Sequence, residues 1–135
     1  MIIYFPSIYP DELIYSWFCR YYVQSGSMTS KMALQELYCK RSDNPNKEFI
    51  GNLNSKAKEL ISRLYPFEKL ILEHTMYPQY ARFLPLSHRQ NTFNQLLQGD
   101  CNSHYLFSSQ PRQYQYLRYC PICVIEDRNL YGETY

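Results

Sequence analysis

The sequence predicts a mainly α-helical protein, with a helix-turn-helix-like domain over about 1–105 and the start of a zinc-finger or zinc-ribbon module over 106–135. Apolar side chains recur at helical spacing through most of the first hundred residues. From about Asp100 onward this pattern ends, and residues 110–119 alternate Gln, Arg and Tyr. The pair Cys120 and Cys123 follows near the end, and Cys-x-x-Cys spacing is typical of a zinc-binding turn. A chain of 135 residues can bury one main core and carry a small appendage.

The best defined helix is expected over about 11–25. Its apolar side chains share one stripe at helical spacing: Leu13, Ile14, Trp17, Phe18 and Tyr21. We expect Trp17 to anchor the core from this stripe. Asp11 and Glu12 fall in the expected first turn, where carboxylates complement the helix dipole, and Gly26 is expected to end the helix.

A second, shorter helix is expected over about 30–38, capped by Thr29 or Ser30. A tight Ser-Gly-Ser turn at 25–27 joins it to the first helix. The two helices together are the start of a possible helix-turn-helix. The polar stretch 40–54 is interpreted as a loop.

Three further helices follow in the sequence pattern. We expect one at about 55–64, and a second at 67–76 that stops before Pro78 because proline disfavours helix at the preceding residue. The third runs from Ser87 to about 97, opened by a capping box and ended by Gly99. We expect an extended lead-in at 110–119 and a helical turn or two at 124–129.

The Cys120-Pro121-Ile122-Cys123 stretch allows three interpretations: a structural zinc half-site, a redox dithiol, or two thiols without a ligand. The zinc half-site is favoured, because aromatic and basic residues lead into the Cys-Pro-x-Cys turn as they do in zinc ribbons. A redox dithiol is disfavoured, because a thioredoxin-like strand and helix pattern is missing around the pair. Two more ligands are needed, so the chain is expected to be a fragment whose remaining ligands lie beyond Tyr135. An internal alternative adds Cys101 and His104 to give a Cys3His set.

The charge pattern predicts at most weak binding to DNA. The net charge is +2, and the small basic excess lies in the middle of the chain. The side chains expected to contact nucleic acid are Lys31, Lys40, Arg41 and Arg118. A cation such as Lys40 or Arg41 near a helix C-terminus can equally serve the helix dipole.

Several function classes are disfavoured by the sequence. His74 has no neighbouring nucleophile or carboxylate pattern, and no glycine-rich phosphate loop is present, so we expect neither an enzyme nor a small-molecule substrate. His74 is expected at a helix end or in the core, and His88 at the surface. Five irregularly spaced cysteines point to a reducing cytoplasm. No apolar run approaches the length of a membrane span.

Four motifs in register resemble the TniQ/TnsD family of bacterial transposon target-selection proteins. They are Phe5-Pro6-x-x-Tyr9-Pro10-Asp11-Glu12-Leu13-Ile14-Tyr15-Ser16, Glu73-His74-Thr75-x-x-Pro78-x-Tyr80-Ala81-x-Phe83, Arg118-Tyr119-Cys120-Pro121-x-Cys123 and Tyr131-Gly132-Glu133. The resemblance implies a helix-turn-helix-like domain joined to a zinc finger, with Cys120 and Cys123 as the first two ligands. It also implies that the protein chooses an insertion site and hands it to an AAA+ ATPase regulator, TnsC, which recruits the transposase.

The sequence therefore predicts a bacterial, cytoplasmic, non-enzymatic adaptor. We expect it to bind the TnsC-like ATPase through an exposed, proline-rigidified N-terminal segment: Phe5, Pro6, Tyr9, Asp11 and Glu12. Double-stranded DNA is the second expected partner, and zinc the expected metal. The alternative is a zinc-stabilised DNA-binding domain of a transcription regulator that acts without an ATPase.

Overall fold

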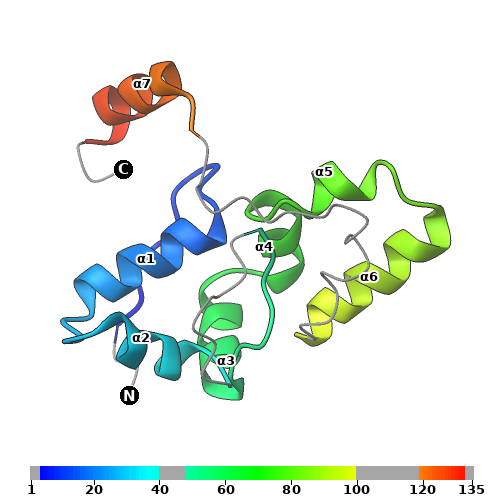
Figure 1. The fold of residues 1–135 in the computed structure, drawn as a ribbon, viewed down its shortest axis with the longest axis horizontal. Helices are drawn as coiled ribbons and strands as arrows, with labels where there is room; N and C mark the ends of the chain where they lie inside the picture. Colours follow the sequence, from blue (N-terminus) through cyan, green and yellow to red (C-terminus); the bar gives the residue numbers. More distant parts are fainter. Residues whose placement is uncertain (1–3, 40–47, 100–118, 133–135) are drawn as a thin grey trace.

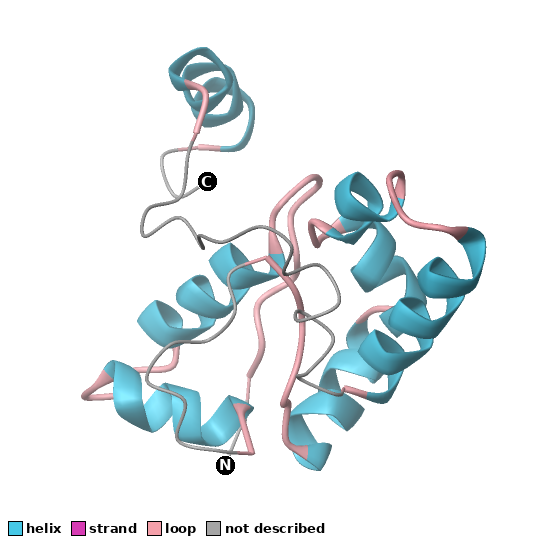
Figure 2. Cartoon of the chain, turned by 45° about the vertical axis from the view of Figure 1, so that its right-hand side comes forward, coloured by secondary structure: helices cyan, strands magenta, loops and turns pink. Residues whose placement is uncertain are grey.

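The computed structural model describes residues 4–39, 48–99 and 119–132, and within them the chain is helical (Figure 1). The helices are α1 (Ile14–Gln24), α2 (Ser30–Leu37), α3 (Ser55–Leu64), α4 (Phe67–Glu73), α5 (Tyr77–Ala81), α6 (Leu86–Gln98) and α7 (Pro121–Tyr131). No strand occurs in these ranges (Figure 2), and the one isolated bridge between extended residues there pairs Tyr38 with Leu53. The mainly α class is confirmed.

The core is built around the aromatic stripe of α1. Trp17 is 1% exposed, as predicted for a core anchor. The ring of Phe5, from the N-terminal segment, lies 4.8 Å from that of Trp17 and stacks on Tyr21 at 4.6 Å. Phe18 makes an edge contact with Tyr38 at 6.0 Å, just after α2. These contacts combine apolar burial with favourable ring geometry, so they hold the N-terminal segment, α1 and α2 together.

Helix α1 begins later than predicted. Asp11 has φ 58°, outside the range of a right-handed helix, and the first helical residue is Ile14. The amide of Glu12 donates to the carbonyl of Tyr9 at 3.3 Å, which places Pro10 and Asp11 at the centre of a turn. Proline first and positive φ second is the pattern of a type II turn. The prediction that Asp11 and Glu12 serve the helix dipole is therefore wrong.

The expected pairing of the first two helices is confirmed. Residues 25–29 join α1 to α2, and Gly26 has the positive φ of 67° that lets the chain reverse after α1. The hydroxyl of Thr29 accepts a 3.4 Å hydrogen bond from the amide of Met32, so Thr29 is the predicted N-cap. Residues 40–47, the first half of the predicted loop, lie outside the described residues.

The segment predicted as one helix over 67–76 divides into two. The Thr75 hydroxyl donates to the carbonyl of Ile71 and accepts from the amide of Tyr77, which ends α4 and begins α5. Pro78 lies inside the first turn of α5, where its missing N–H costs nothing. The sequence pattern did not predict α5. Helix α4 packs against both α5 and α6.

The last two helices also differ from expectation at their ends. Helix α6 is preceded by Pro85 without a side-chain cap, so the predicted capping box at Ser87 is wrong, whereas Gly99 ends the helix with φ 82° as predicted. Helix α7 is longer than the expected turns at 124–129 and has no buried residue. The predicted domain boundary and most of the expected lead-in at 110–119 lie outside the described residues. No helix in the described ranges is long and apolar enough to cross a membrane.

Candidate functional site: the N-terminal segment and the cysteine helix

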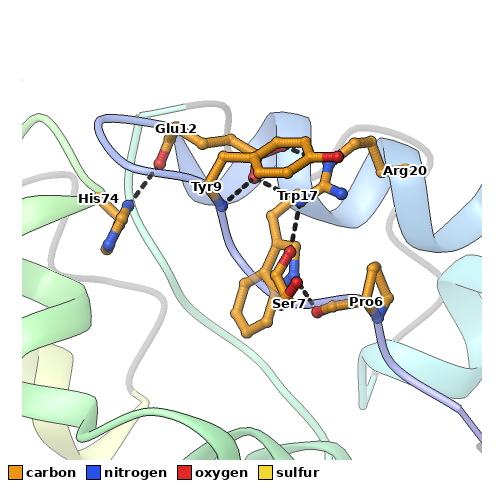
Figure 3. A network of polar contacts seen from close by, with 7 residues as sticks. All are labelled: Pro6, Ser7, Tyr9, Glu12, Trp17, Arg20 and His74. Carbon is orange, nitrogen blue, oxygen red and sulfur yellow. Dashed lines mark hydrogen bonds and ion pairs between the residues drawn. The ribbon is translucent and has the colours of Figure 1, made fainter. Parts of the chain in front are cut away.

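A part-buried ion pair fixes the N-terminal segment to α1 (Figure 3). The guanidinium of Arg20 donates from Nε to Glu12 Oε1 at 2.8 Å and from Nη2 to Glu12 Oε2 at 2.7 Å. The two side chains are only 14% and 6% exposed. The same Nη2 donates to the carbonyl of Ser7 at 2.6 Å. Such a bidentate pair fixes both position and orientation of the segment.

Tyr9 contacts both members of this ion pair. Its amide donates to Glu12 Oε2 at 3.0 Å, and the guanidinium carbon of Arg20 lies 3.9 Å from the centre of its ring. The hydrogen bonds to Glu12 raise the pKa of Arg20, so this cation stays charged under any ordinary condition. Tyr131 of α7 stacks beside Tyr9 with 6.5 Å between ring centres. The contact between these two rings therefore joins α7 to the N-terminal segment.

Two further hydrogen bonds tie the segment to the rest of the fold. The indole of Trp17 donates to the carbonyl of Pro6 at 2.7 Å. His74, at the end of α4, places Nδ1 2.7 Å from the carbonyl oxygen of Glu12. A carbonyl can only accept, so Nδ1 carries the proton. The carbonyl of His74 in turn accepts from the amide of Ile14 at 2.9 Å. The prediction of a core or helix-end histidine is confirmed, because His74 is 3% exposed.

The structure divides the predicted partner-binding residues into two groups. Phe5, Pro6 and Glu12 are buried, so the expectation of exposed rings is wrong at Phe5. Tyr9 is half-buried, and Asp11 is exposed at the tip of the turn. The buried residues hold the turn in place, while Asp11 carries a carboxylate outward. Whether this segment binds a partner stays a prediction.

The two candidate zinc ligands lie at the start of α7. Cys120 is the N-cap residue and Cys123 lies in the first turn, and both are exposed. The amide of Cys123, its thiol and the amide of Ile122 lower the pKa of Cys120. The hydrogen bond to Cys120 raises the pKa of Cys123. A thiol that ionises readily suits a metal ligand.

Two thiols provide half of a tetrahedral zinc site. In the described part of the chain, no group of three or more His, Cys, Asp or Glu side chains gathers. The internal alternative residues, Cys101 and His104, lie outside the described residues. Two thiols at Cys-x-x-Cys spacing are ligands that zinc prefers, so Cys120 and Cys123 fit half of such a site.

Of the four residues predicted to contact nucleic acid, Lys31 lies within the described residues, and it is exposed on α2. Lys40, Arg41 and Arg118 lie outside the described residues. Arg20 of α1, which the sequence analysis did not single out, is instead the cation that contacts Ser7, Tyr9 and Glu12 of the N-terminal segment. Its link to Glu12 spans eight positions and joins an extended segment to a helix. No helical or strand periodicity encodes such a pair.

Comparison with known proteins gives two matches. The model of the TniQ family matches residues 3–134. The Escherichia coli "Transposon Tn7 transposition protein TnsD" is 32% identical to this chain over 136 residues, which cover 97% of the chain and 27% of that relative. The chain thus spans about a quarter of the length of the curated relative that it matches.

Proposed function

The chain belongs to the TniQ family, and on that premise we propose that it acts as a target-selection adaptor in a heteromeric DNA transposition system. Its role would be to recruit an AAA+ ATPase regulator, TnsC-like, to a DNA target site. The observation that carries this proposal is the match to the family along nearly the whole chain. A likeness to a Tn7 transposition protein supports it. We propose no catalytic step.

The ATPase contact is assigned to the exposed rim of the N-terminal segment. Asp11 lies at the tip of the turn, and Tyr4 is 63% exposed at the other end of the segment. The Glu12–Arg20 pair and the Trp17 hydrogen bond hold this rim rigid. Rigid presentation reduces the entropy lost on binding. The rim would therefore favour a partner surface with a cation opposite Asp11.

Asp11→Asn tests this contact without disturbing the turn. Asparagine tolerates positive φ as well as aspartate does, so only the charge is lost. Binding of the purified TnsC-like ATPase in a pull-down should fall several-fold and depend less on salt. Glu68→Gln, at an exposed carboxylate in the first turn of α4, is the matched control and should leave binding unchanged.

The alternative function, a transcription regulator, predicts the opposite binding behaviour. A transcription-regulator domain would bind DNA tightly and specifically and would ignore the ATPase. Wild-type protein with that behaviour would refute the adaptor role. ATPase binding that persists in Asp11→Asn would instead move the contact away from the N-terminal rim.

We further propose that zinc is held by Cys120 and Cys123, with the other two ligands outside the described residues. When bound, the metal would supply a structural cross-link. The two residues already share the first turn of α7, so the metal would fix the direction in which this helix leaves the preceding chain. Helix α7 buries no residue, so it lacks the packing that usually stabilises a short helix, and a metal cross-link would supply stability in its place.

Metal analysis of the chain, and of a longer protein that continues past Tyr135, tests this assignment. Cys120→Ser should abolish stoichiometric zinc wherever it is found. Zinc that survives this change would refute the assignment. Zinc bound by the 135-residue chain and lost on His104→Ala would point to the internal set with Cys101.

A further inference from the structure

Helix α6 presents an exposed face made almost entirely of amides. Its other face packs inward through Thr92 and Leu96, which are both buried. The exposed positions follow the helical spacing i, i+3, i+4, i+7 and i+11: Ser87, Gln90, Asn91, Asn94 and Gln98. Figure 1 shows α6 at the edge of the molecule, away from α1 and α2. A solvated helix face carries charged or polar side chains, and this face is polar without carrying charge.

The charged side chains of this stretch of the chain have one sign. Residues 74–99 contain no Asp or Glu, whereas Arg82, His88 and Arg89 lie among them. Arg82 and His88 are exposed at the two sides of the α5–α6 turn. A surface that combines cations with neutral amides and lacks carboxylates is complementary to a polyanion with hydrogen-bonding groups between its charges.

The backbone around α6 has the connectivity of a helix-turn-helix. A four-residue turn, 82–85, joins α5 to α6, and α4 packs against both helices. The side chain of Arg89 donates to the carbonyls of Leu84 and Arg82, each at 2.9 Å, and so braces the turn from inside. The hydroxyl of Tyr77 donates to the carbonyl of Arg89 at 3.0 Å. These bonds fix the orientation of the first turn of α6 relative to α5.

We infer that α6 is a recognition helix, which lies in the major groove of duplex DNA and contacts base edges through Gln90, Asn91 and Asn94. Asparagine and glutamine can each form two hydrogen bonds with adenine in the major groove, so the site read by α6 contains A·T pairs. Arg82 and His88 contact the flanking phosphates. Leu86, 70% exposed in the first turn of α6, is placed to contact a thymine methyl group.

The first helix pair is less suited to this task. Helix α2 has eight residues, and two apolar side chains are exposed on it or just before it, Met28 at 91% and Met32 at 50%. The DNA-reading element is therefore placed on α6 and not on α2, where the sequence analysis had placed Lys31. This inference rests on the proposed target-selection function, because it names the element that meets the DNA.

The test starts from a pool of duplexes with a randomised core, selected at low salt with the 135-residue chain. We expect enrichment of a short A·T-containing motif. Asn91→Ala should then lower affinity for the selected duplex about tenfold or more, and leave affinity for a scrambled duplex unchanged. Arg82→Ala should weaken both duplexes and reduce the slope of log affinity against log salt by about one. Gln35→Ala, at an exposed amide on α2, is the matched control.

Thermal unfolding of each variant checks that the exposed substitutions leave stability unchanged. No enriched motif, or equal binding of the selected duplex by wild type and Asn91→Ala, would overturn the inference. Loss of ATPase binding in Asn91→Ala with DNA binding intact would also overturn it and make α6 a protein interface. The adaptor role is tested separately by the pull-down of the ATPase with wild-type protein. Asp11→Asn, which tests the position of that contact, should weaken ATPase binding and keep DNA binding.

Discussion

The indole Nε1–H of Trp17 and the carbonyl oxygen of Pro6 lie 2.7 Å apart, across eleven positions of the chain. This hydrogen bond joins the N-terminal segment to the helix that forms the centre of the core. Pro6 is itself fully buried, so the carbonyl has no access to water and relies on the indole.

The Trp17 contact predicts a graded loss of stability. Trp17→Ala should lower the free energy of unfolding by about 3–5 kcal/mol, because it removes a fully buried ring. Trp17→Phe should cost less, because it keeps part of the packing and loses the hydrogen bond to Pro6. Denaturant unfolding of both variants measures this order. A Trp17→Ala protein as stable as wild type would contradict the core assignment.

The Glu12–Arg20 pair predicts a second loss of stability. Glu12→Ala leaves the part-buried Arg20 without its counter-charge, so the free energy of unfolding should fall by about 1–3 kcal/mol. The exposed pair Glu59–Arg63, with side chains 65% and 73% exposed, is the matched control. Glu59→Ala should cause little measurable change. A double-mutant cycle on Glu12 and Arg20 should give a positive coupling energy, and no coupling would show that the pair is dispensable.

The sequence predicted the position of a helix well where the helix has a regular stripe of buried apolar side chains. The apolar stripe of α1 and the segment of α3 were placed to within a few residues, because spacing of 3.6 residues carries that information. The ends were less predictable. The positive φ of Asp11 and the Thr75 bonds that separate α4 from α5 depend on tertiary contacts that no local pattern encodes.

The candidate site was predicted only in part. The sequence drew attention to the N-terminal segment, but exposed aromatic rings were expected where Phe5 packs into the core. The Glu12–Arg20 link was missed because Glu12 lies outside the helix that holds Arg20. The amide spacing of α6 was visible in the sequence, yet its meaning requires knowing which face is buried.

Two buried threonines predict opposite responses to the same substitution. The hydroxyl of Thr92 is buried and has no hydrogen-bond partner in the part of the chain that the structure describes. Thr92→Val should therefore be neutral or raise the free energy of unfolding by up to about 1 kcal/mol. Thr75 makes two hydrogen bonds at the α4–α5 junction, so Thr75→Val should cost about 1–3 kcal/mol. Equal responses in thermal unfolding would contradict the assigned bonding.

Buried tyrosines predict that stability falls at alkaline pH. Burial raises the pKa of Tyr38, and burial together with the 2.7 Å hydrogen bond to Glu36 raises the pKa of Tyr21. Both phenols are then protonated in the folded chain at a pH where they ionise in the unfolded chain. The unfolded state binds fewer protons, so the contribution of these two phenols to the free energy of unfolding is constant below about pH 10 and falls as pH rises further. Tyr38→Phe should reduce this fall, whereas Tyr119→Phe, at a ring 75% exposed, should not. Denaturant unfolding from neutral to alkaline pH measures it, and identical pH profiles for Tyr38→Phe and wild type would refute the role of Tyr38.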